Sequence, residues 1–206
     1  MSDNFRKESE SDAPLIQISQ MITDIVIVII IGFFLNQYVG FPYQVTTRSM
    51  EKTLSADDMV LIDKASYEIS SVKRFDIILF HDLSEETQGM LSQTMYENMD
   101  VKRVIGLPGE KVQIKEGKIY IDDVLLDTKG MYENIAVAGL AKEGVTVGAN
   151  EFFCLGDWID GSEDSRFPGV GNVKREQIIG KVWLRVQPMK DFGIVEYKEV
   201  NDGTAE

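Results

Sequence analysis

Two residues of this chain, Ser49 and Lys102, could together cleave an amide bond. A serine hydroxyl is too weak an acid to attack an amide at neutral pH unless a base removes its proton. A lysine can act as that base only as a neutral amine, and a lysine in water has a pKa of about 10.4. Burial among apolar neighbours favours the neutral form, and Val101, Val104 and Ile105 surround Lys102 in the sequence.

The stretches around these two residues strengthen the pairing. A single serine or lysine is as a rule a solvated turn or strand-end residue. Here the serine lies in the stretch 46–54, a few residues beyond a long apolar segment. The lysine lies in an apolar run, 100–110, that stops at a Pro-Gly turn, and a third stretch, 155–166, is a polar loop that leaves an apolar strand.

Together with the apolar segment, these three stretches resemble the type I signal peptidases, closest to the small single-span kind of Gram-positive bacteria. The serine pattern of that family, Ser-Met-x-Pro-Thr-Leu, aligns on residues 49–54. The lysine pattern, Lys-Arg-x-x-Gly-Leu-Pro-Gly, matches residues 102–109 throughout. The third pattern, Gly-Asp-Asn-x-x-x-Ser-x-Asp-Ser-Arg, aligns on residues 156–166. Lys52 replaces the usual proline and Trp158 the usual asparagine, which affects the expected substrate range more than the chemistry.

The resemblance implies a role for each matching residue. Ser49 would be the nucleophile and Lys102 its general base. The Ser49 amide N–H and the Thr47 hydroxyl would stabilise the oxyanion, and the Ser162 hydroxyl would orient the lysine amine. Met50 corresponds to an apolar residue of the substrate groove. The residues expected to support the site structurally, the last two as an ion pair, are Asp157, Asp164 and Arg166.

Several of these assignments have plainer alternatives. Thr47 is equally well explained as a β-former on an edge strand. An isolated methionine such as Met50 is usually core filler, although Leu54 could fill the core instead. Lys102 and Arg103 point to opposite faces if they lie in a strand, so one can be buried while the other stays in water.

Composition excludes other classes of function. The 206 residues are enough for one membrane anchor and one domain of ordinary size. The net charge of −13 argues against nucleic-acid binding, which needs a basic face. Cys154, the one cysteine, is expected in a buried strand, and His81, the one histidine, at a strand end. Because His and Cys do not cluster, we expect no metal site, and the chemistry implied by the resemblance needs no cofactor.

The apolar segment predicts a membrane anchor over residues 15–40, after a polar tail over residues 1–14. Residues 21–40 alone would span about 30 Å as a helix, the thickness of a hydrocarbon core. A cleaved signal peptide is the alternative, but no small-x-small site follows the segment. Arg6 and Lys7 precede it, which places the N-terminus in the cytoplasm and the remainder on the outer face of the cell membrane.

Residues 41–200 are predicted to form an extracytoplasmic antiparallel β-sheet domain, followed by a flexible tail over residues 201–206. The fold class is therefore mostly β, with one N-terminal transmembrane helix. Residues 82–100 read as a surface insertion with room for a short helix, and residues 127–150 as a looser excursion. The expected strands are residues 58–67, 76–80, 111–115, 118–121, 151–155 and 180–186, the third and fourth joined by a two-residue turn at Glu116-Gly117.

The first hypothesis is a membrane-bound serine endopeptidase that removes signal peptides from exported pre-proteins after a small-x-small sequence. Its partners would be those signal peptides and membrane lipid, with no nucleic acid. The second is a catalytically silent relative that helps to assemble a surface fibre or a secreted protein; retention of Ser49 and Lys102 speaks against it. A third, a soluble Ser-Lys self-cleaving regulator of the repressor type, is disfavoured by the apolar segment and the acidic charge. Oligomeric state is not predicted.

Overall fold

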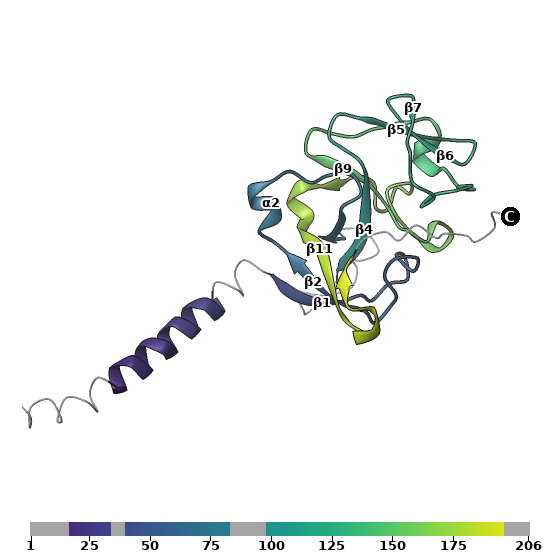
Figure 1. The fold of residues 1–206 in the computed structure, drawn as a ribbon. Coiled ribbons are helices and arrows are strands. Elements are labelled where there is room, and N and C mark those ends of the chain that lie inside the picture. Colours follow the sequence, from purple (N-terminus) through teal and green to yellow (C-terminus); the bar gives the residue numbers. More distant parts are fainter. Residues whose placement is uncertain (1–16, 34–39, 83–97, 196–206) are drawn as a thin grey trace, which may run out of the picture. The chain divides into compact units, whose positions relative to one another are not determined.

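The structure, a computed structural model of the chain, describes residues 17–33, 40–82 and 98–195 (Figure 1). The chain divides into two compact units, Met1–Gly40 and Phe41–Glu206. The predicted tails, residues 1–14 and 201–206, lie outside the described residues.

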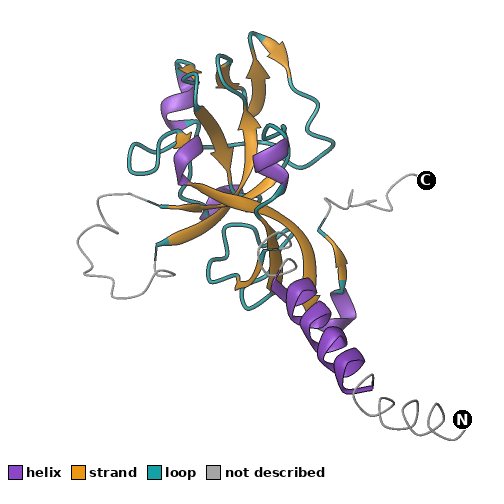
Figure 2. Cartoon of the chain, turned by 90° about the vertical axis from the view of Figure 1, so that its left-hand side faces the viewer, coloured by secondary structure: helices purple, strands orange, loops and turns teal. Residues whose placement is uncertain are grey.

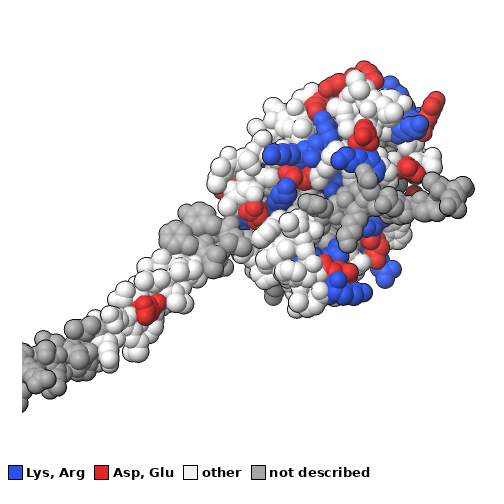
Figure 3. All heavy atoms as spheres, viewed as in Figure 1, with Lys and Arg blue, Asp and Glu red and all other residues white. Residues whose placement is uncertain are grey.

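The first unit contains one described helix, residues 17–33, with exposed apolar side chains along its length. In Figure 3 it is uncharged except for one acidic side chain, and its sequence contains one charged residue, Asp24. Within the described ranges, no helix has both the length and the apolar character that a membrane crossing needs. Part of the predicted segment 15–40, residues 15–16 and 34–39, lies outside those ranges.

The second unit is built on an antiparallel eight-stranded sheet, as predicted for the domain that follows the apolar segment. Its strand order is β1-β2-β11-β3-β4-β9-β10, with β12 paired to β11. Figure 2 shows that the long strands are strongly twisted, as right-handed strand twist requires. The strands are β1 (Phe41–Gln44), β2 (Met59–Asp63), β3 (Ile77–His81), β4 (Met99–Gly106), β9 (Glu151–Leu155), β10 (Val173–Lys174), β11 (Ile178–Gln187) and β12 (Gly193–Ile194).

A smaller antiparallel sheet has the order β7-β6-β5-β8 and lies near β9 at one end of the unit (Figure 1). The predicted hairpin is confirmed, because Lys115 pairs with Lys118 across the turn. Glu116 and Gly117 both have positive φ, 50° and 74°, as a two-residue hairpin turn of the primed type requires. The four strands are β5 (Lys111–Lys115), β6 (Lys118–Ile121), β7 (Val124–Leu125) and β8 (Val145–Thr146).

Short helices connect the strands. The predicted strand 58–67 ends early, at Asp63, because the Asp63 carboxylate accepts the Ser66 amide N–H and a helical turn follows. His81 ends β3, as predicted. Most of the predicted insertion 82–100, residues 83–97, lies outside the described residues. The short helices are α2 (Ser66–Ile69), η1 (Gly139–Lys142), η2 (Ile159–Gly161), η3 (Arg175–Gln177) and η4 (Met189–Asp191).

The core of the second unit has three apolar clusters. One joins the smaller sheet to β9 through residues such as Val112, Ile119 and Phe153. A second lies beneath the segment that follows β1, and the third includes Cys154, which is buried in β9 as predicted. The segment that carries Ser49 therefore rests on a packed layer of side chains.

Candidate active site

Strand β4 carries Lys102 near the middle of the larger sheet. It pairs with β3, where Ile78 lies opposite Lys102, and with β9 on its other side. Lys102 is 1% exposed, so its apolar stem and its amine are both enclosed. The burial among apolar neighbours that the sequence suggested for this residue is found in the structure, here within a strand.

Ser49 lies in the turns between β1 and β2 and is 5% exposed. Successive turns close with hydrogen bonds from Glu51 N to Arg48 O, 3.0 Å, and from Leu54 N to Met50 O, 2.7 Å. The Ser49 carbonyl accepts the amide N–H of Trp158 at 2.9 Å. That bond holds the serine stretch against the third of the three sequence stretches, as a single site requires.

The two residues predicted to work together are in contact. Lys102 Nζ donates to Ser49 Oγ at 3.1 Å, although 53 residues separate them in the sequence. Thr47 Oγ1 lies 3.1 Å from Ser49 Oγ, and Ser49 Oγ lies 3.4 Å from the Val101 carbonyl oxygen, to which it donates. An amine within reach of a buried hydroxyl is the geometry that proton transfer between them needs.

Asp100 also belongs to this group, although the sequence reasoning assigned it no role. Its Oδ1 accepts the Thr47 hydroxyl at 3.1 Å and the Val101 N–H at 2.7 Å, while its Oδ2 accepts Lys102 Nζ in an ion pair. The signal that could have revealed it is the period of a strand, since residues i and i+2 share a face. Asp100 and Lys102 are two residues apart in β4.

Ser162 lies near Ser49 but does not hold the amine. Its Oγ is buried and has no hydrogen-bond partner in the described part of the chain, and Lys102 Nζ bonds to Ser49 and Asp100 instead. A Cβ added to Gly156 would lie 2.1 Å from Ser162 Oγ and 2.6 Å from the Ser49 carbonyl oxygen. Only glycine therefore lets these three segments approach so closely.

Asp164 and Arg166 form a buried bidentate ion pair beside this loop. Arg166 Nε lies 2.8 Å from Asp164 Oδ1, and Arg166 Nη2 lies 3.0 Å from Asp164 Oδ2. Arg166 also donates to the carbonyl oxygens of Ile159 and Ser162, and Asp164 accepts the Gly156 amide N–H. The pair thus ties together the backbone that carries Ser162.

Asp157 forms a second buried pair with Arg103, on the face of β4 opposite Lys102. Arg103 donates twice, from Nε at 2.8 Å and from Nη2 at 2.6 Å, and the Tyr132 hydroxyl donates at 2.9 Å. Burial, followed by the charge of Asp157, raises the pKa of Tyr132 well above its ordinary value, so the phenol stays a donor. The expectation that one of the two adjacent cations stays in water is corrected, because Asp157 lets Arg103 be buried as well.

Met50 was expected at the substrate groove, and the structure corrects this. Its side chain is fully buried in the cluster beneath the serine stretch, with Val45, Leu54 and Val60. The turn from Arg48 to Leu54 directs this side chain inward, and an unbranched thioether fills such a gap well. The plainer alternative, core filler, describes its place.

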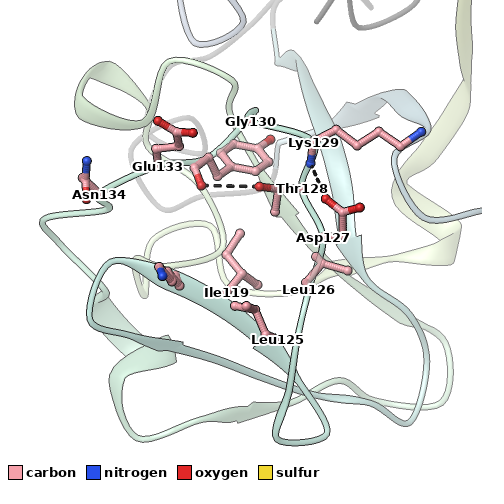
Figure 4. A pocket seen from close by; sticks show the side chains of 11 residues that line it. Ile119, Leu125, Leu126, Asp127, Thr128, Lys129, Gly130, Glu133 and Asn134 are labelled. Carbon is pink, nitrogen blue, oxygen red and sulfur yellow. Dashed lines mark hydrogen bonds between the residues drawn. The ribbon is translucent and has the colours of Figure 1, made fainter. Parts of the chain in front are cut away.

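Two hollows of the second unit have different linings. One, of about 330 Å³, is lined by Arg48, Glu51, Lys52 and Trp158, next to Ser49 in sequence. Another, of about 480 Å³, lies between β6 and the loop 125–134, and its lining includes no residue predicted for the site (Figure 4). No group of three or more His, Cys, Asp or Glu in the described ranges is placed to hold a metal ion.

Comparison with known proteins finds a family model and several relatives. The model of the family "Signal peptidase, peptidase S26" matches residues 18–187. A signal peptidase I from Bacillus caldolyticus is 33% identical over 169 residues, which cover 77% of this chain and 85% of that protein. A probable signal peptidase I-2 from Synechocystis is 29% identical over 193 residues, 92% of this chain and 81% of that protein.

Among solved structures, a signal peptidase I from Enterococcus faecalis V583 is 29% identical and covers 55% of this chain and 98% of that chain, with a TM-score of 0.43. The family match alone extends over most of the chain, from the described helix to the end of β11. The chain therefore belongs to the signal peptidase family, peptidase S26, and is a hydrolase.

Proposed function

We propose that this chain is a serine endopeptidase in which Ser49 attacks the scissile carbonyl and Lys102 takes the serine proton. The observation that carries the proposal is the 3.1 Å contact between Lys102 Nζ and Ser49 Oγ, with both residues buried. In this role the amine must be neutral, because only a neutral amine has the lone pair that accepts a proton. After the attack, the same amine would return the proton to the leaving amide nitrogen.

Charge develops on the carbonyl oxygen during the attack and needs donors. We assign this role to the Ser49 amide N–H and the Thr47 hydroxyl, whose Oγ1 lies 3.1 Å from Ser49 Oγ. Removal of one such donor commonly costs about 2.7–4 kcal/mol of transition-state stabilisation. Thr47→Val should therefore reduce kcat by about 10²–10³-fold while it preserves the shape of the side chain.

The proposed substrates are exported pre-proteins, cut after a small-x-small sequence that ends the signal peptide. The support is the family itself, since the relatives named above are signal peptidases. Lys52 and Trp158 line the hollow next to Ser49 in sequence, so we place them among the groups that select substrates. A silent assembly partner remains the competing function, and retention of the Ser49–Lys102 contact argues against it.

We also propose that residues 15–40 anchor the enzyme in the cell membrane, with residues 1–14 in the cytoplasm and the domain 41–200 on the outer face. The support is the uninterrupted apolar sequence of residues 25–35 within it and the position of Arg6 and Lys7 before it. Protease added to cells stripped of their wall should degrade the domain, and complete protection would refute this topology.

The test of the chemistry is a set of variants assayed on a panel of pre-proteins, with N-terminal sequencing of the products. Residues that act as one unit have non-additive effects, so Ser49→Ala, Lys102→Met and the double variant should retain the same residual rate. Lys102→Arg should be no better, because a guanidinium stays protonated.

Matched controls are Ser55→Ala and Lys118→Met, which alter exposed residues of the same types. Both should cleave like the unmodified protein. Near-normal activity of Lys102→Met together with inactivity of His81→Ala would replace the proposed pair by a histidine mechanism. Unchanged cleavage activity of Ser49→Ala would favour the function of a silent assembly partner.

A further inference from the structure

The carboxylate of Asp100 holds two of the groups that the proposed chemistry needs. Its Oδ2 accepts Lys102 Nζ, and its Oδ1 accepts the Thr47 hydroxyl at 3.1 Å. A second bond to Oδ1, from the Val101 N–H at 2.7 Å, fixes the orientation of the carboxylate. Asp100 therefore connects the proposed base and the proposed oxyanion donor.

Both contacts oppose the working state. A carboxylate beside an amine stabilises the ammonium, which has no lone pair to accept the serine proton. The Thr47 hydroxyl has one proton, and while that proton is donated to Asp100 it is not available to an oxyanion. The Ser162 hydroxyl, which could otherwise accept a hydrogen bond from Lys102, has no partner among the described residues.

We propose that Asp100 is a positioning residue that holds Lys102 and Thr47 in a resting arrangement, so that full activity requires the Asp100–Lys102 pair to lose its proton. The inference rests on the proposed function. In the resting pair the proton stays on Lys102; on activation it leaves to water, which the 16% exposed Asp100 side chain can contact. The neutral amine then has a lone pair with which to accept the proton of the Ser49 hydroxyl that it already contacts, and the Thr47 hydroxyl can turn toward the substrate.

The other titratable groups around this pair do not supply the same charge. Tyr43 of β1 and Cys154 of β9 interact electrostatically with Asp100 and Lys102, respectively. Burial raises the pKa of both groups, so both are neutral near pH 7. The residue of β3 that pairs with Lys102 is Ile78, which carries no charge. Arg103 lies on the opposite face of β4 and is paired with Asp157.

The deciding variant is Asp100→Asn, which keeps the size of the side chain and removes its charge. The rising limb of the pH profile of kcat/KM should move to lower pH by about 1–3 units, the usual effect of one adjacent opposite charge. Asp100→Ala should shift it in the same direction, whereas Asp100→Glu retains a carboxylate and should stay near the unmodified protein. Asp123→Asn, the same charge change at an exposed position that pairs with Lys111 and Lys115, should leave the limb unmoved.

A second measurement does not depend on turnover. The full chain in detergent, labelled with ¹³C at lysine Cε, should show a Lys102 resonance, identified by its loss in Lys102→Met. Its titration midpoint should fall in Asp100→Asn and not in Asp123→Asn. An unmoved midpoint, or a uniform loss of rate with an unchanged pH profile, would overturn the inference. If the midpoint shifts but the unmodified protein cleaves no pre-protein, the effect of Asp100 on Lys102 would be supported and the proposed function refuted.

Discussion

Asp157→Ala should destabilise the domain more than any exposed charge removal. The substitution leaves the Arg103 guanidinium, 3% exposed, without the carboxylate to which it donates twice. Breaking a buried ion pair by removal of one partner costs about 3–5 kcal/mol, because an uncompensated charge stays in the interior. The Tyr132 hydroxyl would lose its acceptor at the same time, which places the expected loss in the upper half of that range.

The companion variants separate the charge from the packing. The double variant Asp157→Leu, Arg103→Met removes both charges. Its loss of unfolding free energy should be about 1–3 kcal/mol smaller than the sum of the losses in the two single variants. Tyr132→Phe, which removes one donor and leaves the ion pair, should cost about 1–3 kcal/mol, since that bond goes to a charged acceptor. Asp123→Ala breaks only exposed pairs, with Lys111 and Lys115, and should cost less than about 1 kcal/mol.

The assay is guanidinium unfolding of the detergent-solubilised chain, followed by far-ultraviolet circular dichroism. This signal reports the β-sheet and does not depend on Trp158, which is adjacent to the mutated position. A loss of about 1 kcal/mol or less in Asp157→Ala would mean that water reaches Arg103, and the buried-pair reasoning would be wrong. Strict additivity in the double variant would refute the coupling between the two residues.

Three further predictions follow from the site and its surroundings. Lys52→Pro and Trp158→Asn should change the ratio of cleavage rates between pre-proteins with little loss on the best one; a 10³-fold loss on every substrate would place them in the bond-breaking machinery. Gly156→Ala should reduce cleavage strongly, because its Cβ would lie 2.1 Å from a buried hydroxyl, and wild-type activity would contradict that packing. The free energy of unfolding, measured by denaturant titration at several pH values, should fall as pH rises above about 8.5. Burial raises the pKa of Cys154 and Tyr132, so only the unfolded chain releases the thiol and phenol protons in this range. Cys154→Ala should make the free energy of unfolding depend less on pH just above about 8.5, where the thiol of the unfolded chain titrates.

The local sequence pattern was sufficient to predict the strands that have clear polar–apolar alternation or continuous apolar runs. The hairpin of β5 and β6 was predicted with its bounds, because the alternation and the Glu116-Gly117 turn agree. The helical turn Ser66–Ile69 was not predicted, because its apolar residues continue the pattern of β2. What ends the strand is a side-chain bond from Asp63 to the following backbone, and periodicity does not report such bonds.

The partners of charged residues were harder to predict than the strands. Ser49 and Lys102 were paired through resemblance, since 53 residues of chain between them leave no local signal of contact. The burial of Arg103 depends on Asp157, which approaches from a different stretch of the chain. Asp100 had a local signal, its place two residues before Lys102, because residues i and i+2 of a strand lie on the same face.

Strand β4 therefore contributes to two ion pairs on its opposite faces, and we expect the two pairs to differ in how readily they open. The pair of Arg103 and Asp157 is bidentate and enclosed, so it fixes the strand in one position. The pair of Lys102 and Asp100 is a single contact to a carboxylate whose side chain is 16% exposed, so we expect it to open more readily than the enclosed pair. It follows that Arg103→Met should lower the free energy of unfolding, while the protein that stays folded keeps the rising limb of kcat/KM at the same pH. Asp100→Asn should move that limb to lower pH with a smaller loss of stability. Measurement of both variants by unfolding and by pH-dependent cleavage tests this division, and a limb that moves in Arg103→Met would show that the two faces are coupled.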